Sequence, residues 1–177
     1  MPEVDIFRSI AELLRSGSAQ PLIYPERVAP STVYDLNYRI SVIALAFDLY
    51  AKSESSGNRR IRTALLKLLQ FVAVRPWLIP MLMDWERTEA EPQLSVLTSQ
   101  KERRGFLTDL MHDDVMEYLV AGQVLKRGPF HLSLGVNGTV LTSLSSTLQA
   151  EGLFENERRA LAEMKDIKIT NNMLEGW

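Results

Sequence analysis

The chain has 177 residues, of which 46 % are hydrophobic and 24 % are charged. This is the composition of a folded globular protein and excludes an intrinsically disordered chain. The formal net charge is -2 and the pI is near 5.8, so the molecule as a whole exerts no long-range attraction on nucleic acid or on an anionic membrane. The absence of cysteine excludes disulfides, thiolate zinc sites and a cysteine nucleophile.

The sequence contains neither a predicted secretory signal nor a predicted membrane span. The first residues, Met1-Pro2-Glu3-Val4-Asp5, lack the basic and apolar regions of a secretory signal. The most apolar stretch, 65–83, is interrupted by charged and polar residues and by two prolines, and so falls short of the run of about 18 apolar residues that a membrane span needs. We therefore expect a cytoplasmic protein without membrane contact.

The first elements are a helix, a connector and a second helix. Apolar residues over 5–15 recur every three and four positions, which predicts a short amphipathic helix. Three prolines over 18–30 favour an extended connector that lies on the body of the fold. Ser31 or Thr32 is the candidate N-cap of the second helix, which is expected to end near Lys52.

A third helix is expected to begin near Arg59 and to end or kink at Pro76, because the proline ring clashes with a continuing helix and supplies no N–H. The following piece, 77–85, is short and apolar. The polar segment 87–100 is the best candidate for an exposed loop.

A fourth helix is expected to start near Ser99, because Ser99 and Glu102 have the spacing of a capping box, and to end at Gly122. Beyond it, alternation and turn residues predict short elements that follow one another closely. These are a β-hairpin over 124–134, helices over 139–150 and 156–165, and a short strand over 167–169.

Together the elements predict a mainly α fold, a single domain over 1–177 of about six helices with a small C-terminal β-hairpin. Its expected parts are an N-terminal helix and connector arm over 1–30, a helical half over 31–86 and a winged-helix-like half over 98–177. Winged-helix modules bind both DNA and protein partners, so this fold does not by itself fix a function.

Side chains able to carry chemistry are sparse. His112, Asp113, Asp114 and Glu117 form the densest set of metal-ligand types. Asp113 and Glu117 share a helix face while His112 points elsewhere, which favours a solvated face over a metal site. His131 falls on the hairpin, on the strand face opposite its apolar neighbours. We expect no metal, no cofactor and no enzymatic activity.

Basic residues gather near the expected starts of two helices, where cations oppose the helix dipole and so call for a compensating anion. The first group is Arg59, Arg60, Arg62 and Lys67, the second is Lys101, Arg103 and Arg104, and the hairpin adds Lys126 and Arg127. Salt bridges on the surface are one explanation. Contact with a phosphate backbone is the other.

Two segments carry a resemblance to a known group of proteins. The helix that contains Asn37-Tyr38-Arg39-Ile40 precedes an apolar block over 65–85 with two prolines. The segment 118–125 precedes Leu132-Ser133-Leu134-Gly135, a helix and then Ile167-Lys168-Ile169-Thr170. In these patterns the chain resembles the middle components of three-component ABC-type, SMC-like antiphage defence systems of the Lamassu type.

The resemblance implies a non-catalytic adaptor that docks on a large SMC-like ATPase and couples it to a nuclease-type effector, with DNA contacted only indirectly or weakly. It carries over no functional residue. The surfaces expected to bind these partners are apolar. They are Leu22, Ile23 and Tyr24 in the connector, Trp77, Leu78, Met81, Met83 and Trp85 in the apolar piece, and Met173, Leu174 and Trp177 in the tail.

The alternative hypothesis is a winged-helix DNA-binding regulator. It would use the basic residues Arg59, Arg60, Arg62, Lys101, Arg103, Arg104, Lys126 and Arg127, and it requires them to lie on one face of the molecule. Its binding would weaken steeply with salt, whereas a protein adaptor need not bind naked DNA.

Overall fold

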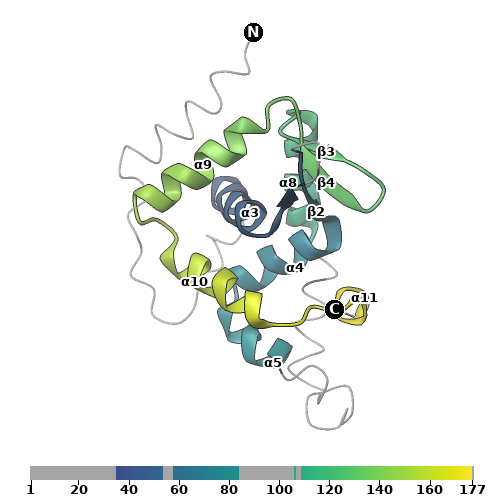
Figure 1. Cartoon of the computed structure of the whole chain (residues 1–177), viewed down its shortest axis with the longest axis vertical. Helices are drawn as coiled ribbons and strands as arrows, with labels where there is room; N and C mark the ends of the chain where they lie inside the picture. The colour runs from purple at the N-terminus through teal and green to yellow at the C-terminus, as the bar shows by residue number, and fades with distance from the viewer. Residues whose placement is uncertain (1–34, 54–57, 84–105, 107–108, 177) are drawn as a thin grey trace.

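A computed structural model describes residues 35–53, 58–83, 106 and 109–176 (Figure 1). The mainly α prediction is confirmed. The helices are α3 (Leu36–Tyr50), α4 (Thr63–Ala73), α5 (Ile79–Met83), α8 (Leu110–Ala121), α9 (Thr139–Ala150), α10 (Glu155–Glu163) and α11 (Asn171–Gly176). The other elements of the described residues are two short 3-10 helices, η1 (Pro76–Leu78) and η2 (Met164–Asp166), and the strands β1 (Lys52–Ser53), β2 (Arg59–Arg62), β3 (Leu125–Arg127) and β4 (His131–Leu134).

Helix α3 is the centre of the molecule. Every side chain from Tyr38 to Phe47 is buried, as expected of a helix that is covered on all sides. Figure 1 shows α9, α4 and α10 around it, and α3 also contacts α8. The N-cap is Asp35, whose carboxylate accepts the backbone N–H of Tyr38 at 2.9 Å. The prediction of Ser31 or Thr32 as the cap of this helix is therefore wrong.

The third predicted helix begins later than expected. Arg59–Arg62 forms strand β2, and α4 starts at Thr63. The reason lies in a distant part of the chain, because β2 pairs antiparallel with β4 and sets Ile61 opposite Leu132 in the core. Such long-range pairing overrides a local helical pattern.

The predicted hairpin is confirmed as β3 and β4, and it belongs to a larger sheet. All pairs are antiparallel and the strand order is β1-β2-β4-β3. When β1, η1 and α5 are set aside, the chain order α3, β2, α4, α8, β3, β4, with β2 beside β4, is that of a winged helix. This arrangement draws one strand and two helices from the 31–86 part, so the 98–177 part does not build it alone.

The predicted break at Pro76 is confirmed. Helix α4 ends at Ala73, and the Pro76–Met83 segment leaves it at an angle of 110°. Within the described parts of the chain, no single helix is long and apolar enough to cross a membrane. Only the two bent pieces taken together meet the criteria of length and composition.

The elements of the C-terminal half agree closely with those predicted from the sequence, with two exceptions. Gly122 ends α8 and the bounds of α9 are those predicted. However, α8 starts at Leu110 behind the N-cap Asp109, so the expected unbroken helix through 106–119 is wrong, and its start near Ser99 lies outside the described residues. The expected strand at 167–169 pairs with no described strand, and α11 follows it instead.

Candidate partner-binding surfaces

The sheet has one covered face and one open face. On the covered face Ile61, Leu125 and Leu132 are buried in the core. On the open face the register aligns Lys52 with Arg60, Arg60 with Ser133, and Ser133 with Lys126, which makes one row across all four strands. Residues paired across antiparallel strands share a face. A second row joins Arg62 to His131.

The structure brings only some of the predicted phosphate-contact residues together. Arg60, Arg62 and Lys126 share the open face, whereas Arg59 and Arg127 alternate to the opposite face. The second basic group, Lys101, Arg103 and Arg104, lies outside the described residues. The expectation that the described members share one face is therefore corrected, because a strand, unlike a helix, sends successive side chains to opposite sides.

Three members of the open face, Lys52, His131 and Ser133, were not among the predicted contacts. Lys52 was expected at the end of a helix, and His131 was expected on a hairpin edge with no role. His131 and the buried Leu132 lie on opposite faces of β4, as predicted. No signal in the sequence joins Lys52 to Lys126, because only the pairing of β2 with β4 places them in one row.

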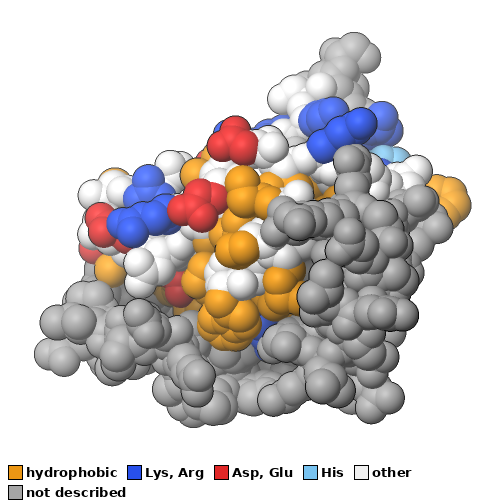
Figure 2. All heavy atoms as spheres, turned by 90° about the horizontal axis from the view of Figure 1, so that it is seen from below, with side chains coloured by type: hydrophobic (Ala, Val, Ile, Leu, Met, Phe, Trp, Pro, Cys, Tyr) orange, Lys and Arg blue, Asp and Glu red, His pale blue; other side chains and the backbone are white. Residues whose placement is uncertain are grey.

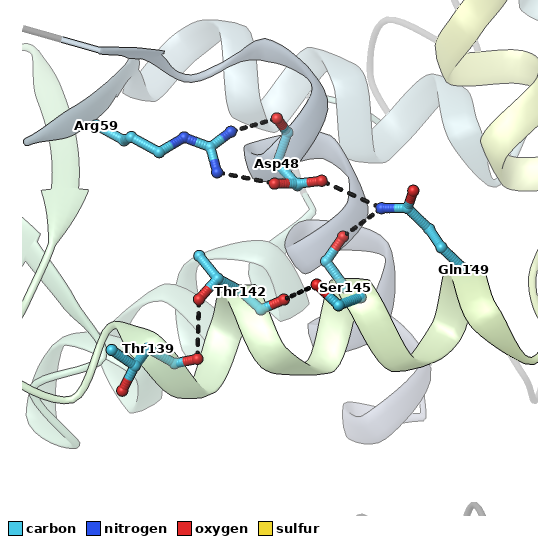
Figure 3. Close-up of polar contacts among 7 residues, drawn as sticks. Asp48, Arg59, Thr139, Thr142, Ser145 and Gln149 are labelled. Carbon is cyan, nitrogen blue, oxygen red and sulfur yellow. Dashed lines mark hydrogen bonds and ion pairs between the residues drawn. The ribbon is translucent and has the colours of Figure 1, made fainter.

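Arg59 stabilises the fold. Its Nη1 lies 2.8 Å from Oδ1 of Asp48, and its Nη2 hydrogen-bonds the Asp48 backbone carbonyl. Figure 3 shows Gln149 from α9 reaching the same carboxylate, with Nε2 donating to Oδ2 at 3.1 Å and to Oγ of Ser145 at 2.9 Å. The cluster ties β2 to α3 and α9.

The pKa of Asp48 reflects these contacts. Partial burial of the carboxylate opposes ionisation, but the hydrogen bonds from Arg59 and Gln149 and the charge of Arg59 outweigh it. The net result is a pKa below the usual value for an aspartate. Asp48 is therefore ionised at neutral pH and holds Arg59 on the covered side of the sheet.

The solvent side of α8 is acidic. Asp113, Asp114 and Glu117 are exposed, and Glu117 Oε1 lies 2.7 Å from Nη1 of Arg127 on β3. In DNA-binding helix-turn-helix proteins the second helix of the motif enters the major groove. Carboxylates at the corresponding positions of α8 would face phosphates of like charge, which disfavours a base-reading role for this helix.

The apolar piece divides into a buried side and an exposed side. Leu78 is core and Met81 is half-buried, whereas 46 % of Trp77 and 62 % of Met83 are exposed. Pro76 and Pro80 are exposed beside them. Figure 2, a view from the end of the molecule that carries α5, shows hydrophobic side chains gathered in the middle of this face. The prediction that Leu78 binds a partner is corrected, because it packs inside.

The other predicted partner contacts either pack in or against the core or lie outside the described residues. Met173 is buried and Leu174 is half-buried against the core, where α11 contacts α4. The tail is thus anchored in the fold, and these two residues are not an exposed apolar surface. Leu22, Ile23, Tyr24, Trp85 and Trp177 lie outside the described residues.

His112 lies inside the protein. Its Nδ1 donates a hydrogen bond to Oε1 of Gln70, and both residues are buried. Burial, together with the charge of Lys67, lowers the pKa of His112 to about 4, so the ring is neutral at physiological pH. Asp113 and Asp114 point to solvent. Among the described residues, no group of three histidines or acids could hold a metal ion.

The neighbouring pair of Arg39 and Asp109 is also buried. Nη1 of Arg39 lies 2.8 Å from Oδ2 of Asp109. The same carboxylate caps α8, since its Oδ1 accepts the backbone N–H of His112 at 3.3 Å. The pair therefore fixes the first turn of α8 against α3.

A groove lies between α3, α9 and α10, with a volume of about 440 Å³. Its walls combine Leu45 and Leu49 with Arg158 and Arg159. Sequence analysis missed it because its walls come from helices far apart in the chain. Arg158 and Arg159 are adjacent on α10, and the groove is also lined by Asp48, which pairs with Arg59 of β2.

Comparisons of the chain with models of protein families, with curated proteins and with solved structures find no match.

Two residues of the segments that carry the family resemblance, Tyr38 and Gly135, have structural roles inside the fold. Tyr38 donates its hydroxyl to Oε1 of Glu157 at 2.7 Å inside the fold. At Gly135 a Cβ atom would lie 2.1 Å from the backbone oxygen of Gln123, so only glycine fits between β4 and the end of α8.

Proposed function

We propose that the protein is a non-catalytic adaptor subunit, located in the cytoplasm, that docks on a large SMC-like ATPase and couples it to a nuclease-type effector in antiphage defence. The observation that carries this proposal is the exposure of Trp77 and Met83 on the bent segment after α4. Trp and Met are enriched at protein interfaces, and aromatic residues dominate their binding energy.

The segment is also held in place before any partner binds. Leu78, Ile79 and Leu82 are buried on its inner side, so Trp77 and Met83 are presented on a packed support. Binding to an ordered surface avoids the entropy that a flexible one loses on association. The identity of the ATPase and of the effector comes from the resemblance, and the exposed side chains support a protein partner of this kind.

The alternative, a winged-helix regulator that reads DNA sequence, finds less support. Its recognition helix would be α8, whose solvent side carries Asp113, Asp114 and Glu117. We therefore assign the winged-helix arrangement to protein docking.

The test is affinity purification of the tagged protein from its native host, followed by mass spectrometry. The wild-type chain should recover an SMC-like ATPase in stoichiometric amount. Trp77→Gln/Met83→Gln should reduce that recovery by roughly tenfold or more, because loss of interface anchors costs about 2 kcal/mol or more.

A matched control removes exposed apolar side chains elsewhere. Phe130 and Val136 are 76 % and 85 % exposed near the hairpin, and Phe130→Gln/Val136→Gln should leave recovery unchanged. Thermal unfolding of both variants establishes that they fold. Recovery of the wild-type protein alone, or equal losses in both variants, would contradict the adaptor proposal at this surface.

A further inference from the structure

We propose that Asn137 is a site of spontaneous deamidation, which the native hydrogen bonds around it slow and whose product loosens the junction between α8 and α9. The chain reaches this junction from β4 through residues 135–138 (Figure 1). Asn137 is the only asparagine of the sequence that is followed by glycine. The inference does not rest on the adaptor function, because it concerns a different part of the molecule and a reaction that needs no partner.

The reaction needs an asparagine side chain and the backbone nitrogen of the next residue. The nitrogen of Gly138 attacks Cγ of Asn137, and the new N–Cγ bond closes a five-membered succinimide ring. The Cγ–Nδ2 bond breaks, the proton of the attacking nitrogen passes through water to Nδ2, and Nδ2 leaves as ammonia. Water then opens the ring at either carbonyl, which gives aspartate or isoaspartate at position 137. Glycine favours ring closure because it has no Cβ beside the attacking nitrogen.

The packing of the junction requires glycine at position 138. A Cβ atom there would lie 2.6 Å from Cβ of Leu134 and 3.0 Å from the backbone oxygen of Gly135. The first distance is far inside the 3.5–4.0 Å or so at which carbon atoms pack. An alanine would therefore push β4 and α9 apart. The fold thus retains the residue that cyclises most easily after an asparagine.

The asparagine itself links two helices. Its Nδ2 donates to the carbonyl of Gly122 at 3.0 Å, and its backbone N–H donates to the carbonyl of Gln123 at 3.0 Å. Gly122 is the C-cap of α8, and Asn137 directly precedes Gly138, the N-cap of α9. The side-chain link requires a donor, which an amide has and an ionised carboxylate lacks.

The same contacts oppose the reaction in the folded protein. Attack requires a free Gly138 nitrogen, yet its N–H donates to the carbonyl of Gly135 at 3.0 Å. Attack also requires Cγ of Asn137 to approach that nitrogen, yet the carboxamide is held on Gly122. Both bonds have to open together, and the frequency of such local opening depends on the contacts that are broken. Water reaches the junction, because Asn137 is half-buried and Val136 is 85 % exposed.

The products weaken the junction for two reasons. With aspartate at position 137, a carboxylate oxygen faces the carbonyl oxygen of Gly122 and no proton lies between them. The negative end of the α8 dipole adds to this repulsion. Isoaspartate also inserts a methylene into the main chain between positions 137 and 138, next to Gly135 and Gly138, where a Cβ atom has no room. Each product therefore removes the link between the end of α8 and the start of α9.

The experiment incubates the purified full-length protein at mildly alkaline pH, folded in buffer and unfolded in urea. Trypsin then releases one peptide, 128–158, which carries both Asn137 and Asn156, and fragmentation in the mass spectrometer assigns the conversion to one of them. Asn137 should convert in both samples, and roughly tenfold or more slowly in the folded one, because two hydrogen bonds must open first. Asn137→Gln, whose longer side chain does not close the five-membered ring, should remove this conversion.

Two controls accompany the measurement. Asn156 is exposed but precedes Glu157, so it should keep its amide while Asn137 converts. A synthetic peptide of residues 132–142, incubated with and without urea, corrects for the effect of urea on the reaction itself. Equal corrected rates in the folded and the unfolded protein would overturn the proposal. Conversion of Asn156 as fast as that of Asn137 would do the same.

The consequence for the junction has its own test. Asn137→Asp, which places the aspartate product in every molecule, should lower the urea midpoint of unfolding followed by circular dichroism. The matched control Asn156→Asp makes the same change in the first turn of α10, where negative charge is favourable, and should not lower the midpoint. An unchanged midpoint for Asn137→Asp would contradict a loosened junction. Neither measurement involves a partner, so failure to recover an ATPase in the affinity purification leaves both results intact.

Discussion

Two Arg–Asp pairs in this protein have the same length and very different surroundings. Arg39 and Asp109 lie 2.8 Å apart with 1 % and 7 % of their side chains exposed. Arg59 and Asp48 also lie 2.8 Å apart, with 25 % and 36 % exposed. Distance alone would rank them equal. Burial separates them, because water screens the outer pair and compensates either partner if the other is lost.

The buried pair positions an element. It joins α3 to the first turn of α8, and Asp109 is also the N-cap of that helix. A buried ion pair adds little net stability compared with apolar residues, but removal of one partner leaves a charge without water or counter-ion. The outer pair instead belongs to a surface cluster with Gln149. If one contact of Asp48 is lost, the other contact and water still stabilise its carboxylate.

The largest expected effect therefore comes from breaking the buried pair. Arg39→Met should lower the free energy of unfolding by about 3–5 kcal/mol, because it leaves Asp109 buried and unpaired. Urea unfolding followed by circular dichroism measures it. Adding Asp109→Asn should restore part of the loss, since asparagine is neutral and still caps a helix. A loss below about 1 kcal/mol for Arg39→Met would show that water reaches Asp109.

The second effect concerns His112, which lies beside the buried pair because its backbone N–H donates to Oδ1 of Asp109. Burial and the nearby Lys67 hold its pKa at about 4, below the 6.5 or so of an unfolded chain. As the pH falls below 6.5, the unfolded chain takes up a proton that the folded protein does not accept until about pH 4. The stability that depends on neutral His112 is thus fully present above pH 6.5 and is lost on the way to pH 4.

The expected loss is about 3 kcal/mol over that interval, at about 1.4 kcal/mol per unit of pH. His112→Gln should remove this part of the pH dependence. Urea unfolding of both proteins between pH 7 and 4 measures the effect. The difference between their free energies of unfolding should change with pH, and the contributions of the acidic residues common to both proteins cancel in that difference. Parallel curves for the two proteins would mean that His112 titrates normally and is hydrated.

The smallest effect is expected for the outer pair. A double-mutant cycle with Arg59→Gln and Asp48→Asn should give a coupling energy of about 0.2–1 kcal/mol, which decreases with added salt. Because the folded-state pKa of Asp48 is depressed, this contribution is present above the unfolded pKa and is lost as the pH falls through the folded one. A coupling energy as large as the loss expected for the buried pair would contradict the conclusion that burial separates the two pairs.

Helix positions were largely predictable because their signals are local. Periodic apolar residues located α9 without error, and Pro76 and Gly122 ended helices where expected. Errors arose where a signal had several candidates close together. Ser31 and Thr32 match an N-cap as well as Asp35 does, but α3 uses Asp35. Helix α8 starts behind Asp109, and the expected start near Ser99 lies outside the described residues.

The candidate surfaces were predictable only in part. Trp77 and Met83 were predicted as partner contacts by residue type and are exposed, whereas Leu78 and Met173, predicted on the same grounds, are core. The basic residues were identified as a group, but their division between two faces of a sheet was not. Residue type gives the chemistry of a surface, and burial decides which residues belong to it.

The sequence by itself determined the mainly helical class, the helix of 139–150, the hairpin and the absence of cysteine chemistry, because each depends on residues within a turn or two of one another or on composition. Only the tertiary structure decided that Arg59–Arg62 is a strand, that Lys52, Arg60 and Lys126 form one row, and that Arg39 meets Asp109. These facts require contacts between residues many positions apart, and such contacts form only when burial of the shared core outweighs local preference.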